Sequence, residues 1–515
     1  TLRLYGNINK TAADAADINT QQNGSYAAGR EGVRNKDINA LLSWKLTPQQ
    51  IVDFDYSYSR QGNIYAGDTQ YSNANVSPDG LVSTLYGDET NRMYRQSWGL
   101  THNGIWDWGQ STFGVYYEKT NNTRMQEGST GKVEGMINNT EYATSRLESY
   151  RSSGELNIPV FWLVDQTLTV GAEWNRDELN DPASMQATSA SGVQIGNVSG
   201  DASSRSSKNS ATLTGIYLED NIEARPGTDI IPGIRFDYHD EFGSNWSPSL
   251  NMSQELGDLF KLKAGIARVF KAPNLYQSSE GYLLSTRGNG CPNTIATGSC
   301  YLLGNPDLDP EISINKEIGL EFNYAGWDAG ITWFRNDYKN KIVAGTDIIG
   351  YASNGNNILQ WENGGKAIVE GLEGNVVIPL VPETLSWRTN ATYMIKSENK
   401  DTGNPLSVIP KYTINTLLDW QVNDKLSTQL QWTQYGRQKP REYAETRNET
   451  GAMSDKEMGA YAVVGLGANY QMTKNLRLNA GISNLFDKRI YRENDGASTY
   501  NEPGRAYYAG VTMSF

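Results

Sequence analysis

The chain alternates apolar and polar residues in short segments that come in pairs. One such run reads, in order, Val52, Asp53, Phe54, Asp55, Tyr56, Ser57 and Tyr58. Successive side chains of a strand point to opposite faces, so this alternation predicts strands with one apolar and one polar face. Pairs of such runs that are joined by a few turn residues predict antiparallel hairpins.

The connections between the runs differ at the two ends of the predicted hairpins. Short turns recur near Pro48, Asp107, Val164, Pro226, Asp258, Gly326, Pro382, Asp424 and Lys474. Longer polar stretches, rich in Gly, Asn, Ser and Thr, occupy residues 11–37, 61–92, 120–148, 178–209, 271–312, 336–366, 397–408, 437–458 and 487–503. Short periplasmic turns and long extracellular loops are typical of transmembrane β-barrels. The predicted fold class is therefore all-β: one closed transmembrane antiparallel β-barrel over residues 1–515, with about 20 strands.

Composition supports a barrel over a helical membrane protein. The 515 residues are 38% hydrophobic, the mean hydropathy is -0.58, and no apolar run approaches the ~18 residues of a helical span. Barrel strands alternate lipid-facing and lumen-facing residues, so their average hydropathy stays low. The net charge of -13 disfavours broad electrostatic binding to nucleic acid. No nucleic-acid partner is expected.

Histidine and cysteine are scarce. His102, His239, Cys291 and Cys300 are the only residues of these types, too few at this spacing for an ordinary zinc or haem site. Cys291 and Cys300 close a short loop of small polar residues, which predicts a disulfide formed in an oxidising compartment. The alternative is a pair of free surface thiols.

Aromatic residues and the C-terminus carry further signs of a membrane barrel. Trp and Tyr cluster at the ends of predicted strands, as in the pairs Trp106/Trp108, Trp327/Trp333 and Trp420/Trp432. Such clusters are typical of interfacial girdles, although cross-strand aromatic pairs in a soluble sheet would also produce them. The last predicted strand places Tyr507 and the terminal Phe515 on one face. This pattern resembles the C-terminal signal for insertion into the bacterial outer membrane.

Several longer motifs point to one family. The runs at 270–276 (FKAPNLY), 304–311 (GNPDLDPE), 484–487 (NLFD) and 500–505 (YNEPGR) resemble the barrel of TonB-dependent outer-membrane receptors. The runs at 65–70 (YAGDTQ), 86–92 (YGDETNR) and 333–338 (WFRNDY) resemble the ferric enterobactin receptor branch in particular.

The resemblance implies a fold, a function and partners. Receptors of this family have a 22-stranded barrel filled by an N-terminal plug. We expect the plug, the TonB-contacting region and one more hairpin to lie upstream of this chain. The implied function is uptake of a ferric catecholate siderophore across the bacterial outer membrane, energised by the TonB complex. Outer-membrane lipid and lipopolysaccharide are the other expected partners, and the barrel is expected to be a monomer.

The resemblance also implies binding residues. A ferric triscatecholate is a bulky anion with flat aromatic faces, and its iron is already coordinated, so the receptor needs no cofactor. Arginine stacks on rings and donates to oxygens, and cation–π attraction adds to such contacts. The implied ligand-binding residues are Tyr65, Tyr94, Arg95, Tyr117, Arg124, Tyr282 and Arg287, with Tyr26, Arg30 and Lys132 as further candidates. Residues 81–85 (LVSTL) lack the basic and aromatic residues that relatives carry there, which indicates fewer cations or the use of another loop.

Other functions are less favoured. A passive large-diameter pore, or a receptor for another ferric siderophore, would also fit a wide barrel with a polar lumen. An outer-membrane enzyme is not expected, because neither histidine has an evident nucleophile and carboxylate partner. Acidic runs such as residues 237–241 are expected to face water or lipopolysaccharide.

Overall fold

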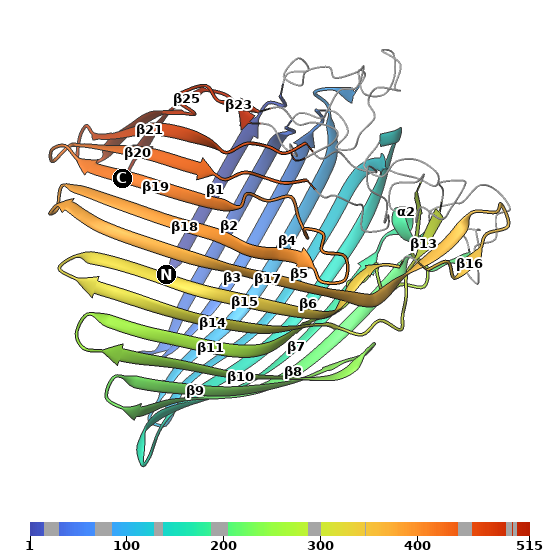
Figure 1. The fold of residues 1–515 in the computed structure, drawn as a ribbon, viewed down its shortest axis with the longest axis horizontal. Helices are drawn as coiled ribbons and strands as arrows, with labels where there is room; N and C mark the ends of the chain where they lie inside the picture. The colour runs from blue at the N-terminus through green and yellow to red at the C-terminus, as the bar shows by residue number, and fades with distance from the viewer. Residues whose placement is uncertain are drawn as a thin grey trace.

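The computed structural model describes residues 1–14, 30–66, 85–127, 137–186, 204–286, 300–345, 347–440, 456–490, 497 and 502–515. In this part of the chain the main sheet contains 23 strands. Three of them, β12, β13 and β16, form a small separate ladder with the first residues of β17. The other twenty curve into a barrel (Figure 1).

The barrel strands are β1 (Leu2–Thr11), β2 (Gly32–Thr47), β3 (Gln50–Ile64), β4 (Glu89–Trp106), β5 (Gly109–Glu127), β6 (Ile137–Trp162), β7 (Val164–Asn180), β8 (Lys208–Arg225), β9 (Thr228–His239), β10 (Gly243–Leu256), β11 (Phe260–Lys271), β14 (Glu311–Tyr324), β15 (Trp327–Ala344), β17 (Asn357–Val381), β18 (Leu385–Asn399), β19 (Tyr412–Gln421), β20 (Leu426–Tyr435), β21 (Tyr461–Gln471), β22 (Leu476–Ser483) and β25 (Ala506–Met513). The smaller elements are α2 (Pro182–Met185), β12 (Leu283–Thr286), β13 (Cys300–Leu303), β16 (Gly350–Tyr351), β23 (Arg489–Ile490) and β24 (Glu502–Pro503).

Each barrel strand pairs antiparallel with the next one along the chain, from β1 through to β22 and then β25. The predicted number of about 20 strands is confirmed for the described residues. No register pairs β1 with β25 among the described strands, so these two strands are the edges of the sheet. The predicted closed ring is therefore not formed by these twenty strands alone.

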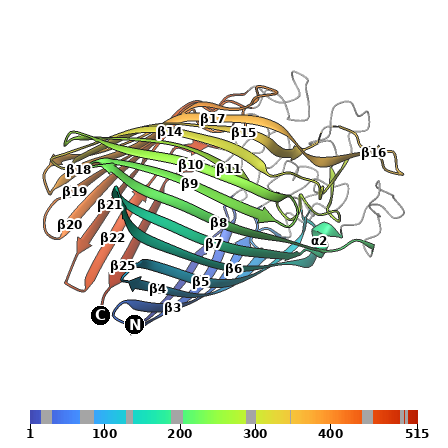
Figure 2. The ribbon, with the colours of Figure 1, turned by 90° about the horizontal axis from the view of Figure 1, so that it is seen from below.

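The two ends of the barrel differ as predicted. The turns at one end are tight; Ala325 and Gly326, for example, join β14 to β15 with positive φ angles of 50° and 83°. Figure 1 shows these turns along one rim and the smaller elements at the opposite end, and Figure 2 shows both termini at the short-turn end. One connection at the long end is short, because His239 pairs directly with Gly243.

The outer face of the barrel is apolar. Phe54 pairs with Leu42 on one side and Leu100 on the other, and these side chains are 44%, 48% and 46% exposed in the isolated chain. A continuous row of exposed apolar residues needs an apolar surrounding, and a bilayer provides it. The prediction that the Val52, Phe54, Tyr56 and Tyr58 face points to lipid is confirmed.

The inner face of the same strands is polar. Ser57 pairs with Ser97, and their hydroxyl oxygens lie 2.5 Å apart. Asp55 lies beside Glu118 and Arg151 along a small lumenal cavity. A wide barrel leaves room for water or for a plug, so polar side chains on this face carry no burial cost.

Aromatic residues border the apolar band. Near the loop end, Trp98 lies between Tyr56 and Tyr117; its ring is tilted against Tyr56 at a centroid distance of 5.4 Å and stacked on Tyr117 at 5.5 Å. Near the short turns, Trp106 stacks on Trp108 at 6.1 Å. Two rows of this kind, one at each end of the band, match the girdles of a membrane barrel better than isolated cross-strand pairs.

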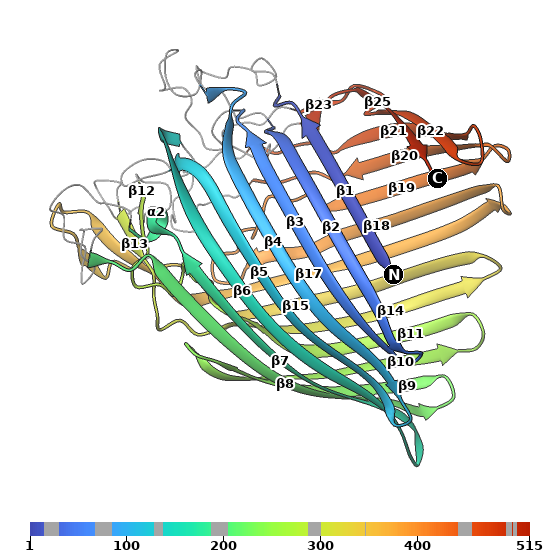
Figure 3. The same ribbon diagram turned by 180° about the vertical axis from the view of Figure 1, so that it is seen from behind.

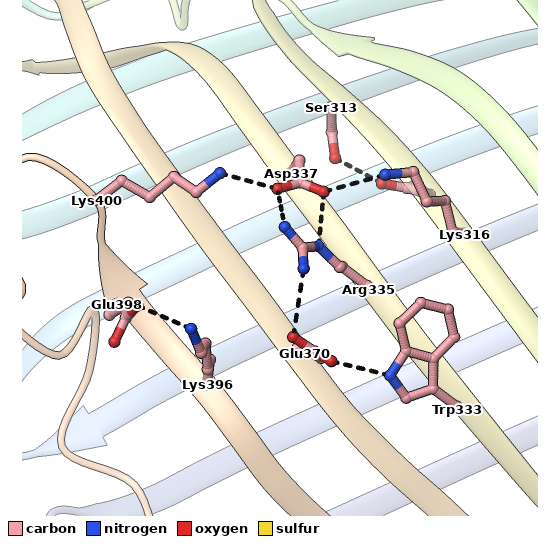
Figure 4. A network of polar contacts seen from close by, with 10 residues as sticks. Ser313, Lys316, Trp333, Arg335, Asp337, Glu370, Lys396, Glu398 and Lys400 are labelled. Atoms are coloured by element: carbon pink, nitrogen blue, oxygen red, sulfur yellow. Dashed lines mark hydrogen bonds and ion pairs between the residues drawn. The ribbon is translucent and has the colours of Figure 1, made fainter.

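On β14, β15 and β17, charged side chains lie next to the loop-side girdle, on the side of the loops. Trp333 Nε1 donates to Glu370 at 3.0 Å, and Arg335 contacts both Glu370 and Asp337. Lys316 and Lys400 complete the group around Asp337 (Figure 4). On β15 the change from aromatic Trp333 to charged Arg335 takes two residues and marks the edge of the apolar band.

Buried apolar clusters lie outside the membrane-spanning part, beneath the loops. One contains Tyr65, Leu85, Met125 and Ile137. Another contains Leu283, Tyr301, Leu303, Ala352 and Ile358. None of the helices in the described ranges is long and apolar enough to cross a bilayer.

The C-terminal strand has the predicted face. Tyr507 pairs with Ile482 and is 71% exposed, and Phe515 follows β25 with its ring fully exposed. The proposed role of Tyr507 and Phe515 in membrane insertion stays a prediction.

Candidate functional site

A cavity of about 850 Å³ opens on the inner face of the barrel between β4 and β8. Its walls include Tyr116, Arg151 and Asp177 from the strands and residues 272–276, which follow β11. A site of this volume fits within the ~300–1,000 Å³ of small-molecule pockets. The cavity lies at the loop end of the lumen, where a ligand from outside would arrive.

Arg151 is the most available cation of the cavity. It lies on the inner face of β6, where it pairs with Tyr116 on β5 and Asn175 on β7. It also lines the adjoining cavity of about 330 Å³. Among the described residues, no hydrogen bond or ion pair engages its guanidinium. Its planar, permanently charged group is suited to stacking on a ring and donating to oxygens.

Of the two carboxylates in the cavity wall, Glu173 and Asp177, the first is partly neutralised. Glu173 accepts from Arg235 at 2.9 Å, and Arg235 also contacts the buried carboxylate of Asp237. The Arg235 guanidinium lies over the ring of Tyr217 at 5.6 Å. This network fixes Glu173 on the wall and lowers its repulsion of an anionic ligand.

Tyr276 anchors the segment that covers the cavity. Its phenol donates to Asp181 at 2.7 Å, and its ring meets Tyr282 edge-on at 5.6 Å. Burial raises the pKa of Tyr276 well above its ordinary range; the Asp181 contact also raises it, and the nearby charge of Arg124 lowers it. The structure therefore brings two predicted residues, Arg124 and Tyr282, close to one phenol.

Family-like motifs hold this segment in place. Asn274 accepts from the backbone N–H groups of Tyr276 and Gln277. A Cβ on Gly304 would lie 1.8 Å from the carbonyl oxygen of Ser279, so only glycine fits there. Asn305 donates to the carbonyl of Trp361 at 2.8 Å. The runs at 270–276 and 304–311 thus contain residues that fix the loop by hydrogen bonds and close packing.

The 484–487 motif has a similar structural role at another loop. Asn484 accepts from the Lys488 N–H and donates to the Lys488 carbonyl. Asp487 accepts from the Arg505 backbone N–H at 2.9 Å, and this bond is the largest cause of a lowered Asp487 pKa. Arg505 Nε donates to the Leu485 carbonyl.

Arg95, like Arg124, shares the inner face of the barrel with Arg151. It pairs with Thr120 across β4 and β5 and forms an ion pair with Glu118 at 2.5 Å. Because Glu118 also lines the smaller cavity, Arg95 lies at the edge of the site. Its charge is already shared with a carboxylate.

Tyr94 and Tyr117 lie on the outer face instead. Tyr117 stacks on Trp98, contacts Tyr150 at 5.1 Å, and donates to Glu148 at 2.7 Å. Tyr94 pairs with Arg60 on that face. The strand period places both rings toward the membrane side, so their predicted role in ligand binding gains no support from the geometry.

The other described candidates have mainly structural contacts. Tyr65 is 3% exposed in a loop cluster with Leu85. Arg30 is exposed, and its guanidinium lies 3.9 Å from Asp14. Tyr26, Lys132, Arg287 and Cys291 lie outside the described residues. Cys300 is buried and disulfide-bonded, but the predicted pairing with Cys291 stays a prediction.

Sequence reasoning missed Arg151, Tyr116, Tyr276 and Asp181. The first two were detectable, because the alternation on β5 and β6 assigns Tyr116 and Arg151 to the polar face. The contact between Tyr276 and Asp181 joins residues 95 positions apart and has no local pattern. No group of three or more His, Cys, Asp and Glu in the described part of the chain is arranged to hold a metal ion.

Fold and site together define a large outer-membrane barrel with a polar lumen and a vestibule of cationic and aromatic side chains. Comparison with known proteins agrees. The family described as "TonB dependent receptor-like, beta-barrel" matches residues 41–485. The chain belongs to the TonB-dependent receptor family, whose members reside in the bacterial outer membrane. Its long loops are extracellular and its short turns periplasmic.

Two relatives of the chain are named as receptors for ferric enterobactin. A ferric enterobactin receptor, PirA, from Pseudomonas aeruginosa is 55% identical over 523 residues, covering 100% of this chain and 70% of the relative. The ferrienterobactin receptor of Escherichia coli is 46% identical, with 100% of this chain and 72% of the relative covered. These relatives are transport receptors and not enzymes.

Solved structures show the same barrel. A mutant of the ferric enterobactin receptor PfeA from Pseudomonas aeruginosa, in complex with enterobactin, matches with a TM-score of 0.93 at 46% identity, covering 100% of this chain and 76% of that chain. The siderophore receptor PirA from Acinetobacter baumannii matches with a TM-score of 0.91 at 47% identity, covering 100% and 75%.

Proposed function

We propose that this barrel binds a ferric catecholate siderophore of the ferric enterobactin type and, within the intact receptor, passes it across the outer membrane. The observation that carries the proposal is the match over the whole chain to receptors named for ferric enterobactin, at 46–55% identity. A structure with enterobactin bound has the same fold at a TM-score of 0.93.

The chemistry of the lumenal cavity supports the same ligand class. A ferric triscatecholate offers negative charge and flat rings, while its iron has no free coordination position. The cavity offers the available guanidinium of Arg151, the ring of Tyr116 and the phenol of Tyr276, with Arg124 nearby. Arginine and tyrosine recognise charge and rings together. No metal ligand and no cofactor is needed for this recognition.

Energy for transport is assigned to the TonB complex. The chain spans 70–72% of the length of these relatives. The barrel is proposed to function as a monomer that is surrounded by outer-membrane lipid and lipopolysaccharide. The exposed apolar outer face supports this surrounding.

A ligand panel tests the proposal. The full-length receptor, purified in detergent, is titrated with ferric enterobactin and with a ferric hydroxamate while tryptophan fluorescence is followed. We expect saturable quenching by the catecholate and at least 100-fold weaker binding of the hydroxamate. Equal affinity for both ligands, or no saturable quenching by ferric enterobactin, would contradict the proposed ligand class.

A further inference from the structure

The lumenal wall around the site carries more negative than positive charge. Two adjoining cavities of about 850 and 330 Å³ share the inner face of β3 to β8, the wall that faces the viewer in Figure 3. Their permanently charged lining residues are one arginine and four carboxylates, namely Arg151, Asp55, Glu118, Glu173 and Asp177. A ferric triscatecholate is itself a trianion, so an excess of carboxylates opposes its binding.

Two of the four carboxylates have a cationic partner outside the cavities. Glu118 forms an ion pair with Arg95 at 2.5 Å. Glu173 accepts from Arg235 at 2.9 Å, but Asp237 contacts the same guanidinium at 2.8 Å. One arginine offsets only one of these two carboxylates. These partners therefore leave no positive charge to spare for an anionic ligand.

Strand β9 and the covering segment add no positive charge either. His239 Nδ1 accepts from the Glu241 backbone N–H at 3.1 Å, so this nitrogen carries no proton and the ring is neutral. The Asp240 carboxylate lies 3.5 Å from the same nitrogen. Residues 272–276, which cover the cavity, contain no charged side chain.

Two cations lie beside the covering segment, and each has a carboxylate in its surroundings. The Lys271 ammonium lies 3.6 Å from Glu311. The charge of Arg124 acts on Tyr276, whose phenol donates to Asp181. Asp181 is 2% exposed, so its carboxylate is part of the same buried group. The excess of negative charge at the cavity wall remains.

Asp177 is the carboxylate of the larger cavity that lacks a partner in the described part of the chain. It lies on the inner face of β7, opposite Ser149 on β6 and Ala211 on β8. No hydrogen bond or ion pair among the described residues engages it. Arg151 is one diagonal step away, opposite Asn175, and does not pair with it. A cation and a carboxylate therefore face the same cavity separately.

We propose that the cavity prefers a ferric triscatecholate whose scaffold carries amine groups, and that Asp177 determines this specificity. A protonated amine of the scaffold donates to the Asp177 carboxylate, while the catecholate oxygens and rings contact Arg151. This proposal rests on the proposed function and narrows its ligand class. A cationic scaffold offsets the charge of the ferric centre, which makes ligand and wall complementary. The competing explanation is an ion pair between Arg151 and Asp177 that has no role in specificity.

Three ligands test the proposal on the full-length receptor in detergent, with tryptophan fluorescence as the readout. They are ferric enterobactin, a synthetic ferric triscatecholate with a lysyl spacer in each arm of the trilactone, and the Nε-acetylated form of that lysyl ligand. The acetylated form has the same arms without the amines. Asp177→Asn removes the carboxylate charge and keeps the size of the side chain. Glu178→Gln is the matched control, because Glu178 is the next residue on β7, faces outward and accepts from Arg176.

In the wild type we expect the lysyl ligand to bind roughly tenfold more tightly than its acetylated form, and added salt should reduce this difference. In Asp177→Asn the advantage should disappear, because the lysyl ligand loses its carboxylate. Ferric enterobactin should bind Asp177→Asn severalfold more tightly, since a repelling charge is gone. Asp55→Asn, in the smaller cavity, should shift both affinities in the same directions, and Glu178→Gln should shift neither. Heat-modifiable migration in gels checks that each variant is folded.

Two outcomes would overturn the proposal while ferric enterobactin still binds. Equal affinity of the wild type for the lysyl and acetylated ligands would show that the amines are not recognised. A parallel change of all three affinities in Asp177→Asn would assign Asp177 to a structural role or to an ion pair with Arg151. Failure of the proposed function looks different, because none of the three ligands would then bind saturably, and that result would overturn both.

Discussion

Tyr116 and Tyr117 are neighbours on β5, yet they belong to different environments. Tyr116 lines the lumenal cavity, and its hydroxyl lies 3.1 Å from that of Thr101. Tyr117 stacks on Trp98 in the outer girdle, and its hydroxyl donates to Glu148. The difference shows that residue type does not identify a ligand contact in a barrel. The face of the sheet on which a residue lies decides whether it can contact the ligand, because the face sets whether its ring meets the lumen or the membrane.

Arg151 and Arg176 differ in the same way as the two tyrosines. Arg151 faces the lumen and no described partner engages it, whereas Arg176 faces outward and contacts Glu178, Thr212 and Ser210. The inner arginine is open to an incoming ligand. The outer one is held in the rim of the membrane-facing surface. The inner and outer faces of β5 to β8 therefore differ in how available their arginines are to a ligand.

The largest expected effect comes from placing a charge on the outer face. Leu156→Arg puts a guanidinium in the middle of the apolar band and should cost ~2–4 kcal/mol of unfolding free energy. Ser153→Arg, on the lumenal face of the same strand, should change it by less than ~1 kcal/mol. Urea unfolding in lipid vesicles measures both. Equal losses in the two variants would contradict the assignment of faces.

Removing the lumenal cation should have the next largest effect. A hydrogen bond to a charged group contributes ~1.5–3 kcal/mol, so Arg151→Ala should weaken ferric enterobactin binding by roughly 10- to 150-fold. Arg176→Ala on the outer face is the control and should leave the affinity within twofold. Fluorescence titration measures both, and added salt should reduce the difference between Arg151→Ala and wild type. Full affinity in Arg151→Ala would move the site elsewhere.

Tyr276→Phe should loosen the segment that covers the cavity. The change removes the bond to Asp181 and leaves a buried carboxylate without that donor, at a cost of about 1–3 kcal/mol of local stability. Faster hydrogen exchange of the backbone amides at residues 274–282 would report it. Exchange of the backbone amides on β20 serves as an internal reference.

The same residue predicts a pH dependence. The pKa of Tyr276 is raised in the folded protein, so its stabilising contribution is fully present below the ordinary tyrosine pKa of 10.0. It is lost only as the pH rises through the higher folded value. The exchange difference between wild type and Tyr276→Phe should therefore be constant from about pH 7 to 10. A difference that disappears below pH 9 would show that the phenol is not held by Asp181.

The smallest effect is expected at the outer girdle. Tyr117→Phe removes a hydroxyl that donates to Glu148 and keeps the stacked ring, so stability should change by ~0.5–1.5 kcal/mol at most. Ferric enterobactin affinity should stay within twofold. A tenfold loss of affinity would restore the role in ligand binding that the sequence predicts for Tyr117 and would contradict the division between the two faces.

Local patterns predicted most of the barrel. Alternation and tight turns are properties of neighbouring residues, and so the strand number and the apolar face of β3 were accessible without a structure. The lumenal positions of Tyr116 and Arg151 were accessible by the same rule. The resemblance to relatives instead directed attention to Tyr94 and Tyr117, which the register places outside.

Contacts between distant loops could not be predicted in this way. Tyr276 and Asp181 meet because the segment after β11 folds back over the end of β7, and no periodic pattern encodes that approach. The short connection between His239 and Gly243 was also missed, since its polar residues resemble those of the longer loops. Loop packing depends on tertiary contacts that override local preference.

The most direct test is a structure of the full-length receptor with ferric enterobactin bound. The account predicts the ferric catecholate on the inner side of the barrel, with its rings or oxygens within hydrogen-bonding or stacking distance of Arg151 and of the 272–276 segment. No catecholate should lie near Tyr94 or Tyr117. A siderophore bound to the β14–β20 side, with Arg151 distant from it, would contradict the account.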